Sequence, residues 1–387
     1  MKASAFHRSS YPNPISSRRS FLAISAGGAL AVAAGVRLGA ARAQSTGYDQ
    51  GTKIEGDYTF TGGTYTSYAG DTLYQYAHDD KGDAYYNSYD GTEWSGWEGY
   101  AEQPAKVAYD PATTTYDSKS YSYYTGEDGY LYEQSWDSYG EAKWDDVSGD
   151  YTYAAAPYAT AYEDTLHLYG AADDGYVYHK TYDSSGWGTW EAVNETPYWA
   201  GYKPYAVSWG EYDNVFWLGE DQYVYWNRYS YADKTWTGAK QIPSDYTFKA
   251  TPYAVGYAPE KSLYAYSANA DGAPVYNAFD GEAWSGWTPY EVDWTATYQP
   301  NAYVYEDVQH VVYTDDTGKG YHTTYGADGW SGEWDDLGGN YGYDSYQYEY
   351  DGSLYLTYTG EDGGIYYKTY SGDGSATIEP TATEDPY

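Results

Sequence analysis

The chain has 387 residues, with 57 acidic residues against 20 basic ones and a formal net charge of −37 at pH 7. A surface this acidic repels nucleic acid and anionic membranes, so neither is expected as a partner. The sequence has no cysteine, which excludes disulfides and thiol chemistry, and its 59 Tyr and 16 Trp are too many for a disordered protein.

The first 43 residues have the pattern of an export signal. Arg18 and Arg19 precede Phe21 and Leu22, an uncharged Ala/Gly-rich run follows, and Ala41-Arg42-Ala43 ends it. The paired arginines resemble a twin-arginine signal, which exports proteins in folded form. A membrane anchor is less favoured, because a further arginine interrupts the apolar run before it could span a bilayer. The sequence therefore predicts a secreted or cell-surface protein with no membrane span after residue 43.

Removal of this segment would make the chain more acidic. Six of the 20 basic residues and none of the 57 acidic ones lie in residues 1–43, so residues 44–387 carry 14 basic residues and a net charge of −43. Salt would screen this self-repulsion. Adaptation to high salt explains the acidic composition at least as well as a role of the acidic residues in ligand binding does.

A repeat runs through residues 44–374. A phrase with an acidic residue, usually a glycine and then aromatic residues recurs at separations of 45 to 50 residues. Its seven copies are centred on Gly82, Gly129, Gly175, Gln222, Gly272, Gly318 and Gly363. In the third copy, alternating runs at Pro157–Tyr162, Thr165–Gly170 and Tyr176–Tyr182 precede Trp187 and Trp190. Tyrosine favours strands, and Gly, Asp, Asn and Ser favour the turns between them.

Four short strands in 45 to 50 residues match the size of one β-propeller blade. The repeat predicts an all-β protein, a seven-bladed β-propeller of four-stranded antiparallel blades in a single domain at residues 44–374. Residues 375–387 lose aromatic density and are expected to form a flexible acidic tail.

The seventh copy ends without a tryptophan strand. Thr52–Phe60 ("TKIEGDYTF") is similar to Ala142–Tyr153 ("AKWDDVSGDYTY"), with Ile54 standing where Trp144 stands. We therefore expect the N-terminal segment to complete the last blade by pairing with residues near 365–370. Such pairing closes the ring and leaves no open sheet edge.

The third copy resembles the blades of bacterial and fungal propeller lectins, including fucose-binding and tectonin-like ones. The matching residues are Asp174-Gly175, the aromatic strand Tyr176–Tyr178 and the Trp element Gly186–Trp190. This resemblance implies carbohydrate binding at repeated sites between blades, with glycans or cell-surface polysaccharide as partners. Lectins of this family often use an arginine in the sugar pocket, but Arg228 is the single arginine after residue 43. The sugar specificity therefore does not carry over.

An element with one or two tryptophans occurs once in each of six copies. They are the pairs Trp94/Trp97, Trp187/Trp190, Trp284/Trp287 and Trp330/Trp334 and the single Trp144 and Trp236. A tryptophan face stacks on a sugar ring, and repeated weak sites add avidity. Two residues three apart on a strand point to opposite faces, so one member of a pair is expected in the core. We assign Trp97, Trp144, Trp190 and Trp287 to the structural set. The carbohydrate-binding candidates are Trp94, Trp187, Trp236, Trp284 and Trp330, although packing of both members explains the pattern equally well.

Two histidines complete the candidate site. His179 and His322 occupy the same repeat position, where other copies carry other residue types, so both are expected to face the surface along an inter-blade groove. They would lie across the ring from each other and cannot share a metal ion. Acidic turns have the oxygen ligands that Ca²⁺ prefers, but none shows the EF-hand spacing. No cofactor is expected, and the sequence assigns no metal ligand.

Enzyme functions are less favoured. A sialidase needs three arginines to hold its carboxylate substrate, which one arginine cannot supply. No nucleophile-elbow, zinc-protease, P-loop or dinucleotide motif is present. Hydrolysis of polysaccharide by two carboxylates stays open because the sequence has 57 acidic residues. The sequence favours a non-catalytic carbohydrate-binding propeller, followed by an extracellular scaffold with purely structural repeats and then a polysaccharide-active enzyme.

Overall fold

The computed structural model describes residues 47–100, 102–136, 142–197 and 202–370. The expected export signal with Arg18 and Arg19 and the expected tail at 375–387 lie outside these residues. Within these ranges no helix has the length and apolarity needed to cross a bilayer.

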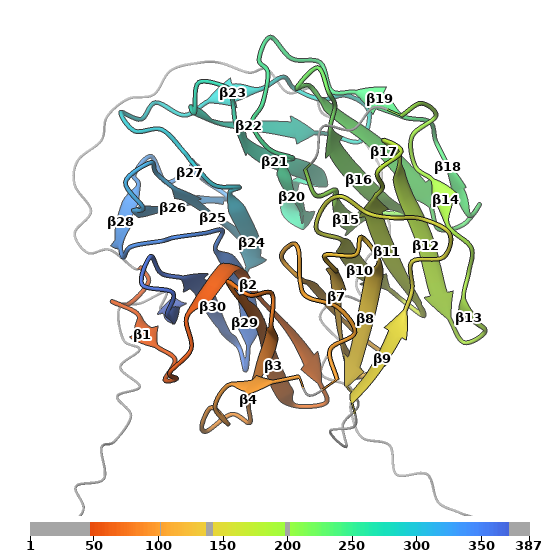
Figure 1. The fold of residues 1–387 in the computed structure, drawn as a ribbon. Coiled ribbons are helices and arrows are strands. Elements are labelled where there is room, and N and C mark those ends of the chain that lie inside the picture. The colour runs from red at the N-terminus through yellow and green to blue at the C-terminus, as the bar shows by residue number, and fades with distance from the viewer. Residues whose placement is uncertain (1–46, 101, 137–141, 198–201, 371–387) are drawn as a thin grey trace, which may run out of the picture. The chain divides into compact units, whose positions relative to one another are not determined.

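The described residues form seven antiparallel sheets, one for each repeat (Figure 1). Blade one holds β2 (Phe60–Ala69), β3 (Thr72–Asp79), β4 (Ala84–Tyr89) and β5 (Glu98–Gly99). Blade two holds β6 (Ala112–Tyr116), β7 (Lys119–Thr125), β8 (Leu131–Trp136) and β9 (Ala142–Asp146). Blade three holds β10 (Tyr158–Tyr162), β11 (Thr165–Ala171), β12 (Val177–Asp183), β13 (Gly186–Trp187) and β14 (Glu191–Ala192).

The other four blades repeat this order. Blade four holds β15 (Tyr205–Trp209), β16 (Tyr212–Leu218), β17 (Val224–Ser230), β18 (Thr235–Trp236) and β19 (Lys240–Gln241). Blade five holds β20 (Tyr253–Tyr257), the 3₁₀ turn η2 (Ala258–Glu260), β21 (Ser262–Ala268), β22 (Pro274–Phe279) and β23 (Thr288–Pro289). Blade six holds β24 (Asn301–Tyr305), β25 (Val308–Thr314), β26 (Gly320–Gly326), β27 (Gly329–Trp330) and β28 (Asp335–Gly338). Blade seven holds β29 (Tyr346–Tyr350), β30 (Ser353–Thr359), β31 (Ile365–Tyr370) and, from the N-terminal end, β1 (Thr52–Lys53).

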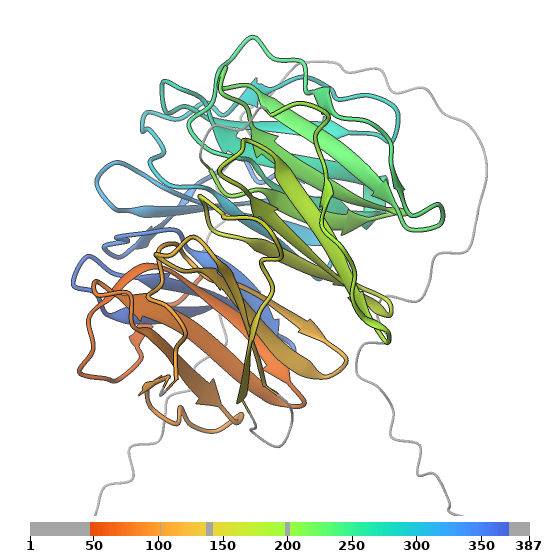
Figure 2. The same cartoon turned by 45° about the vertical axis from the view of Figure 1, so that its right-hand side comes forward.

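The predicted all-β fold with seven blades is confirmed. The three long strands expected in the third repeat agree with β10, β11 and β12 to within one residue. The first strand of each blade lies toward the middle of the ring and the last at its periphery, as β20 to β23 of blade five show (Figures 1 and 2).

The repeated glycine makes the turn between the second and third strands of each blade. In all seven copies the residue at this position has a positive φ, between 63° and 88°. Its N–H donates to the carbonyl three residues earlier, as from Gly129 to Gly126 at 2.9 Å. A side chain is strained in this conformation, so glycine is preferred there. Gln222 adopts it without being glycine, at φ 63°.

The N-terminal segment closes the ring, as expected. β1 pairs antiparallel with β31, and orange β1 lies near the blue strands of blade seven in Figure 1. The finer alignment of Ile54 with Trp144 is wrong. The Ile54 N–H donates to Ile365 O at 2.8 Å, just as the Val147 N–H donates to Leu131 O at 2.9 Å. Ile54 therefore takes the place of Val147.

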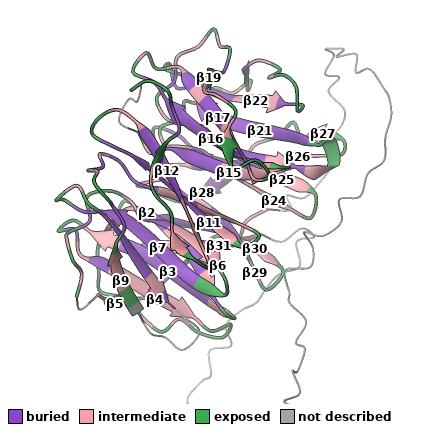
Figure 3. Ribbon diagram, turned by 90° about the vertical axis from the view of Figure 1, so that its right-hand side faces the viewer, coloured by how far each residue is buried: buried purple, intermediate pink, exposed green. Residues whose placement is uncertain are grey.

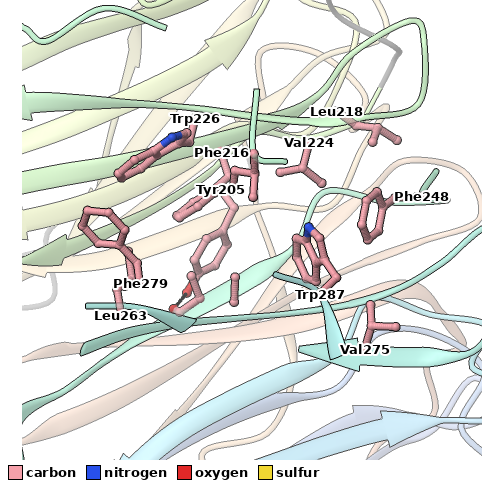
Figure 4. Packing of buried hydrophobic residues seen from close by; sticks show 13 residues of the cluster. Tyr205, Phe216, Leu218, Val224, Trp226, Phe248, Leu263, Val275, Phe279 and Trp287 are labelled. Atoms are coloured by element: carbon pink, nitrogen blue, oxygen red, sulfur yellow. Dashed lines mark hydrogen bonds between the residues drawn. The ribbon is translucent and has the colours of Figure 1, made fainter. Parts of the chain in front are cut away.

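The core lies between the sheets. The largest cluster joins Phe216 and Trp226 of blade four to Leu263, Phe279 and Trp287 of blade five (Figure 4). The middles of the long strands are buried and the connecting turns are exposed (Figure 3). Tyrosines take many positions that aliphatic residues hold in other cores, and each must place a hydroxyl inside the fold.

One polar link joins blades that are far apart in the ring. The ammonium group of Lys203, just before β15 of blade four, donates to the hydroxyl of Tyr65 of blade one at 2.9 Å. It also lies 3.5 Å from a carboxylate oxygen of Asp344, just before blade seven. This link helps to hold the inner strands in a closed ring.

Candidate functional site

Neighbouring blades enclose seven inter-blade slots. Slot 1 lies between blades one and two, and slot 7 lies between blades seven and one. The earlier blade lines each slot with its second and third strands. In slots 2 to 5 and in slot 7, the later blade contributes the tryptophan that begins its outer strand.

The five candidate tryptophans lean toward the preceding blade. Ring centroids are 6.3 Å apart for Trp187 and Tyr123, 5.2 Å for Trp236 and His179, 5.3 Å for Trp284 and Trp226, and 5.1 Å for Trp330 and Tyr276. Trp94 packs on a cluster that includes Ile365 of blade seven. All five are half-buried, and no tryptophan in the described part of the chain is exposed.

The expectation that paired tryptophans point to opposite sheet faces is wrong. In blade one, Tyr89 lies opposite Trp94 whereas Tyr85 lies opposite Gly99, so the outer strand holds one extra residue. This β-bulge shifts the alternation by one position. Trp94 and Trp97 therefore lie on the same side and pack in one cluster.

The bulge recurs in other blades. Glycines with φ near 95°, Gly96 at 94° and Gly286 at 97°, separate the tryptophans of blades one and five. In blade six, Trp330 and Trp334 are four residues apart and the outer strand holds two extra residues, so this pair also shares one cluster. Both tryptophans of each pair pack against the preceding blade.

Burial separates the two members of a tryptophan pair in two blades. Trp97 and Trp287 are 7% and 8% exposed and belong to the core, whereas their partners are half-buried. Trp144 and Trp190, which were assigned to the structural set, are half-buried. Burial therefore does not separate the two members of the pair in blade three.

The expectation that His179 and His322 face the surface is wrong. Both are buried, at 0% and 1% exposure, and each ring lies inside an inter-blade slot. His179 is 3.0 Å from His167, and His322 is 3.1 Å from His310. The varied residue types at this position reflect the neighbouring blade that each one meets. The His pairs were missed because their partners come from a different strand.

Slot 2 holds buried polar groups that the sequence did not single out. Glu133 of β8 is 6% exposed and lies opposite Tyr123 of β7, which is fully buried. The Tyr123 hydroxyl interacts with the Glu133 carboxyl across the sheet, but among the described residues neither that hydroxyl nor the Oε2 atom of Glu133 makes a hydrogen bond of full geometry. Burial raises the pKa of Glu133 to about 7, and the Tyr123 hydroxyl opposes this shift. On its other side Glu133 lies opposite Asp145 in the outer strand, so the polar row runs to the edge of the sheet.

A lysine and two indoles face this row. The ammonium group of Lys180 is 4.4 Å from the ring of Trp187 and 4.8 Å from that of Trp190. It donates to Val147 O of blade two at 2.5 Å. Burial lowers the pKa of Lys180 to about 8, and the nearby Glu133 opposes this shift. Slot 2 thus joins an acid, a base, a hydroxyl and aromatic faces.

The other slots explain why the Tyr123 hydroxyl has no partner across the slot. Tyrosines at the same position in other blades donate across the slot, from Tyr169 to Asp213 at 2.6 Å and from Tyr266 to Gln309 at 2.5 Å. By strand register, the residue of blade three that faces Tyr123 is Leu166, which offers no acceptor. No single repeat reveals this, because the two residues belong to different blades.

Within the ranges described, no group of three or more His, Asp or Glu side chains could hold a metal ion. The acidic turns instead use their carboxylates locally. Asp174 accepts hydrogen bonds from the Tyr176 N–H and from the Tyr178 hydroxyl, at 3.1 and 2.8 Å. These turns therefore stabilise the entry to the third strand.

Solved structures of lectins have a similar fold. The BP39L lectin from Burkholderia pseudomallei is similar with a TM-score of 0.69 and 13% identity over 81% of this chain and 97% of the lectin. This chain shares its fold with that lectin. The fucose-specific lectin from Aleuria aurantia matches with a TM-score of 0.47 and 12% identity over 70% of this chain and 95% of that one. AofleA from Arthrobotrys oligospora matches with a TM-score of 0.49 and 14% identity, over 69% and 85%. No family model and no curated protein matches the sequence.

Proposed function

We propose that the protein is a carbohydrate-binding propeller and that slot 2 is its principal glycan site. The observation that carries this proposal is the set of polar atoms in slot 2. The Tyr123 hydroxyl and a Glu133 oxygen interact with each other but make no hydrogen bond of full geometry among the described residues, and burial in that state is costly. Sugar hydroxyls both donate and accept hydrogen bonds, and they would satisfy such groups.

The aromatic residues of slot 2 suit the same ligand. Trp187 and Tyr182 are half-buried and their ring centroids are 5.2 Å apart. The apolar face of a sugar ring stacks on such side chains. Lys180 offers two further donors beside the one given to Val147 O, and its position near two indoles holds it in the slot. The fold shared with the BP39L lectin supports this function, and the proposal includes no catalytic step.

A glycan array read at low and high salt tests the proposal. We expect Glu133→Gln, Tyr123→Phe and Trp187→Ala each to weaken binding by about tenfold, equivalent to about 1.4 kcal/mol. Trp94→Ala is the matched control, because its slot carries Tyr367 and Asn87 where slot 2 carries Glu133 and Lys180. Equal losses from Trp94→Ala and Trp187→Ala would argue against a special role for slot 2. An array with no bound glycan would favour a purely structural scaffold.

We also infer that the protein acts outside the cytoplasm, at the cell surface or in the medium. Arg18, Arg19 and the small-residue pattern that ends at Ala43 support this inference. Replacing both arginines by lysine should retain the precursor inside the cell. Export of the doubly substituted chain at the parent rate would contradict a twin-arginine route.

A further inference from the structure

Four of the five histidines after residue 43 form two matching pairs. In slot 3, Nδ1 of His167 and Nε2 of His179 are 3.0 Å apart. In slot 6, Nδ1 of His310 and Nε2 of His322 are 3.1 Å apart. The rings of each pair are nearly parallel, with interplanar angles of 16° and 12°. The four side chains are at most 2% exposed.

Such spacing requires that one ring nitrogen donates and the other accepts. Two charged imidazoles would bring two donors together, so each pair is stable only while at least one ring is neutral. Burial lowers the pKa of His167 to about 4 and that of His310 to about 2. A proton taken up by either pair must therefore be compensated by a nearby carboxylate or must disrupt the packing.

The two pairs differ in their carboxylates. In slot 3, the buried Asp213 lies 3.4 Å from Nδ1 of His167, and Glu191 lies 3.2 Å from Nδ1 of His179. In slot 6, by strand register, Leu354 takes the place of Asp213. There the acid near the pair is Asp335, 3.5 Å from Nδ1 of His322, and its side chain is 36% exposed. The Glu191 side chain is 47% exposed, so the outer carboxylates of the two slots are alike. The difference is the buried Asp213, which compensates positive charge inside slot 3 where slot 6 has Leu354.

Slot 6 is covered by the segment that closes the ring. The ring of Tyr48 lies 5.3 Å from that of His322 in an edge-on contact. The Tyr48 hydroxyl accepts a hydrogen bond from Nε2 of Gln347 at 2.7 Å. The Asp49 N–H donates to Thr369 O at 3.1 Å. Together with β1, these residues form the N-terminal clasp, residues 48–54.

We propose that the His310–His322 pair makes ring closure acid-sensitive, so that proton uptake in slot 6 releases the N-terminal clasp. The matching pair in slot 3 is less sensitive to acid, because the buried Asp213 partly compensates a proton on His167. Mild acid thus opens the ring at the junction where its two ends meet.

Most of the neighbouring groups favour this outcome, and one carboxylate of the clasp, Asp49, opposes it by partly offsetting the charge of Lys368. The titratable groups around the slot 6 pair are Asp335 of β28, Tyr305 of β24, Tyr370 of β31 and Tyr48 of the clasp. Tyrosines stay neutral in mild acid and supply no negative charge. A cation, Lys368 of β31, is 1% exposed and donates to Asp49 O of the clasp at 3.1 Å. A charged histidine in the same slot would be repelled by it.

Hydrogen exchange of the full chain between pH 7.5 and pH 5.0 tests the proposal. The readout is the protection factor, which corrects for the pH dependence of intrinsic exchange. The Ile54 N–H, bonded to Ile365 O at 2.8 Å, reports the clasp. The Ile242 N–H, bonded to Val224 O at 2.8 Å, reports the equivalent strand that covers slot 3. We expect the protection of Ile54 to fall by at least about tenfold at pH 5.0, and that of Ile242 to fall clearly less.

Variants taken from this chain's own repeats identify the responsible pair. Blade five carries Tyr264 and Tyr276 at the positions of His310 and His322, so the double variant H310Y/H322Y should keep the clasp protected at pH 5.0. H310N, which copies Asn214 of blade four, is a smaller change with the same expected direction if the double variant does not fold. H167Y/H179Y is the matched control and should leave acid release unchanged. Unchanged protection of Ile54 at pH 5.0, equal loss at Ile242, or acid release persisting in H310N would overturn the proposal.

Discussion

At the scale of single residues, the slots show how a tyrosine-rich core handles its hydroxyl groups. Tyr169 and Tyr266 donate to polar residues of the next blade, whereas Tyr123 meets Leu166 there and makes no hydrogen bond of full geometry. A buried hydroxyl without a partner costs free energy, and a partnered one that is removed leaves its acceptor unsatisfied. The same substitution should therefore have opposite effects at the two kinds of position.

Tyr123→Phe should stabilise the fold by about 1 kcal/mol, because it removes a hydroxyl that makes no hydrogen bond of full geometry and leaves the ring in place. Tyr169→Phe should destabilise it by about 1–3 kcal/mol, because the buried Asp213 loses a donor. Urea unfolding of both variants at pH 7.5 measures the difference. Destabilisation of equal size in both would mean that Tyr123 finds an acceptor in solution.

The raised pKa of Glu133 makes the free energy of unfolding depend on pH. Its folded pKa of about 7 is above the ordinary value of 4.5, because burial disfavours the carboxylate. The folded state therefore holds a proton that the unfolded chain has released. The cost of ionising Glu133 is absent below the unfolded pKa, grows as the pH rises toward 7 and stays at about 3 kcal/mol above it.

Glu133→Gln should thus raise the free energy of unfolding at pH 7.5 by up to about 3 kcal/mol and should raise it much less at pH 5.0. Urea unfolding of parent and variant at both pH values measures this. The stability gain of the variant at pH 7.5 is compared with its gain at pH 5.0, so the titration of all other groups cancels. Glu282→Gln, an exposed position, is the control and should change stability little at either pH. A gain of the same size at both pH values would show that ionisation of Glu133 is not the cause.

At the scale of elements, the repeated turn and the bulge decide where side chains point. Six of the seven turns place glycine where φ is positive, and Gln222 is strained in the same conformation. In blades one and five the bulge in the outer strand contains a glycine with positive φ, and it brings both tryptophans of a pair to one side. Backbone conformation at single positions thus controls which face of each blade is aromatic.

Gln222→Gly should stabilise the protein by about 0.5–1 kcal/mol, since relief of left-handed strain exceeds the extra entropy of glycine in the unfolded chain. The reverse change, Gly129→Ala, should destabilise it by about 1–2 kcal/mol, because φ is 80° and the new Cβ would lie 3.3 Å from Thr152. Thermal and urea unfolding measure both. Loss of stability in Gln222→Gly would indicate that the Gln222 side chain contributes contacts that outweigh the strain.

At the scale of the whole molecule, the stability of the fold depends on ring closure and on the net charge. Only two residue pairs join β1 to β31, yet they complete the last blade and leave Ile54 buried against Trp97 of blade one. The ring must stay closed while residues 44–387 carry a net charge of −43. Self-repulsion of this size opposes the compact state, and the core between blades must overcome it.

Salt should therefore stabilise the protein. Raising NaCl from 0.1 to 1 M shortens the Debye length from about 10 Å to about 3 Å and weakens repulsion between exposed carboxylates. We expect the urea midpoint to rise steadily over this range. KCl at the same ionic strength should give the same rise, because screening does not depend on the cation. A midpoint that is independent of salt would mean that repulsion contributes little to the stability of the fold.

The sequence determined the number of blades, the strand and turn order and the closing role of the N-terminal segment. These features are local or repeated, because glycine at a positive-φ turn and alternating tyrosines act within one blade and recur seven times. Only the tertiary structure decided which side chains meet in the slots. A one-residue bulge placed Trp94 beside Trp97, and contacts between blades buried His179 and His322 and set Tyr123 against Leu166. Such contacts join residues about one repeat apart, so they depend on strand register and blade packing, which no single repeat encodes.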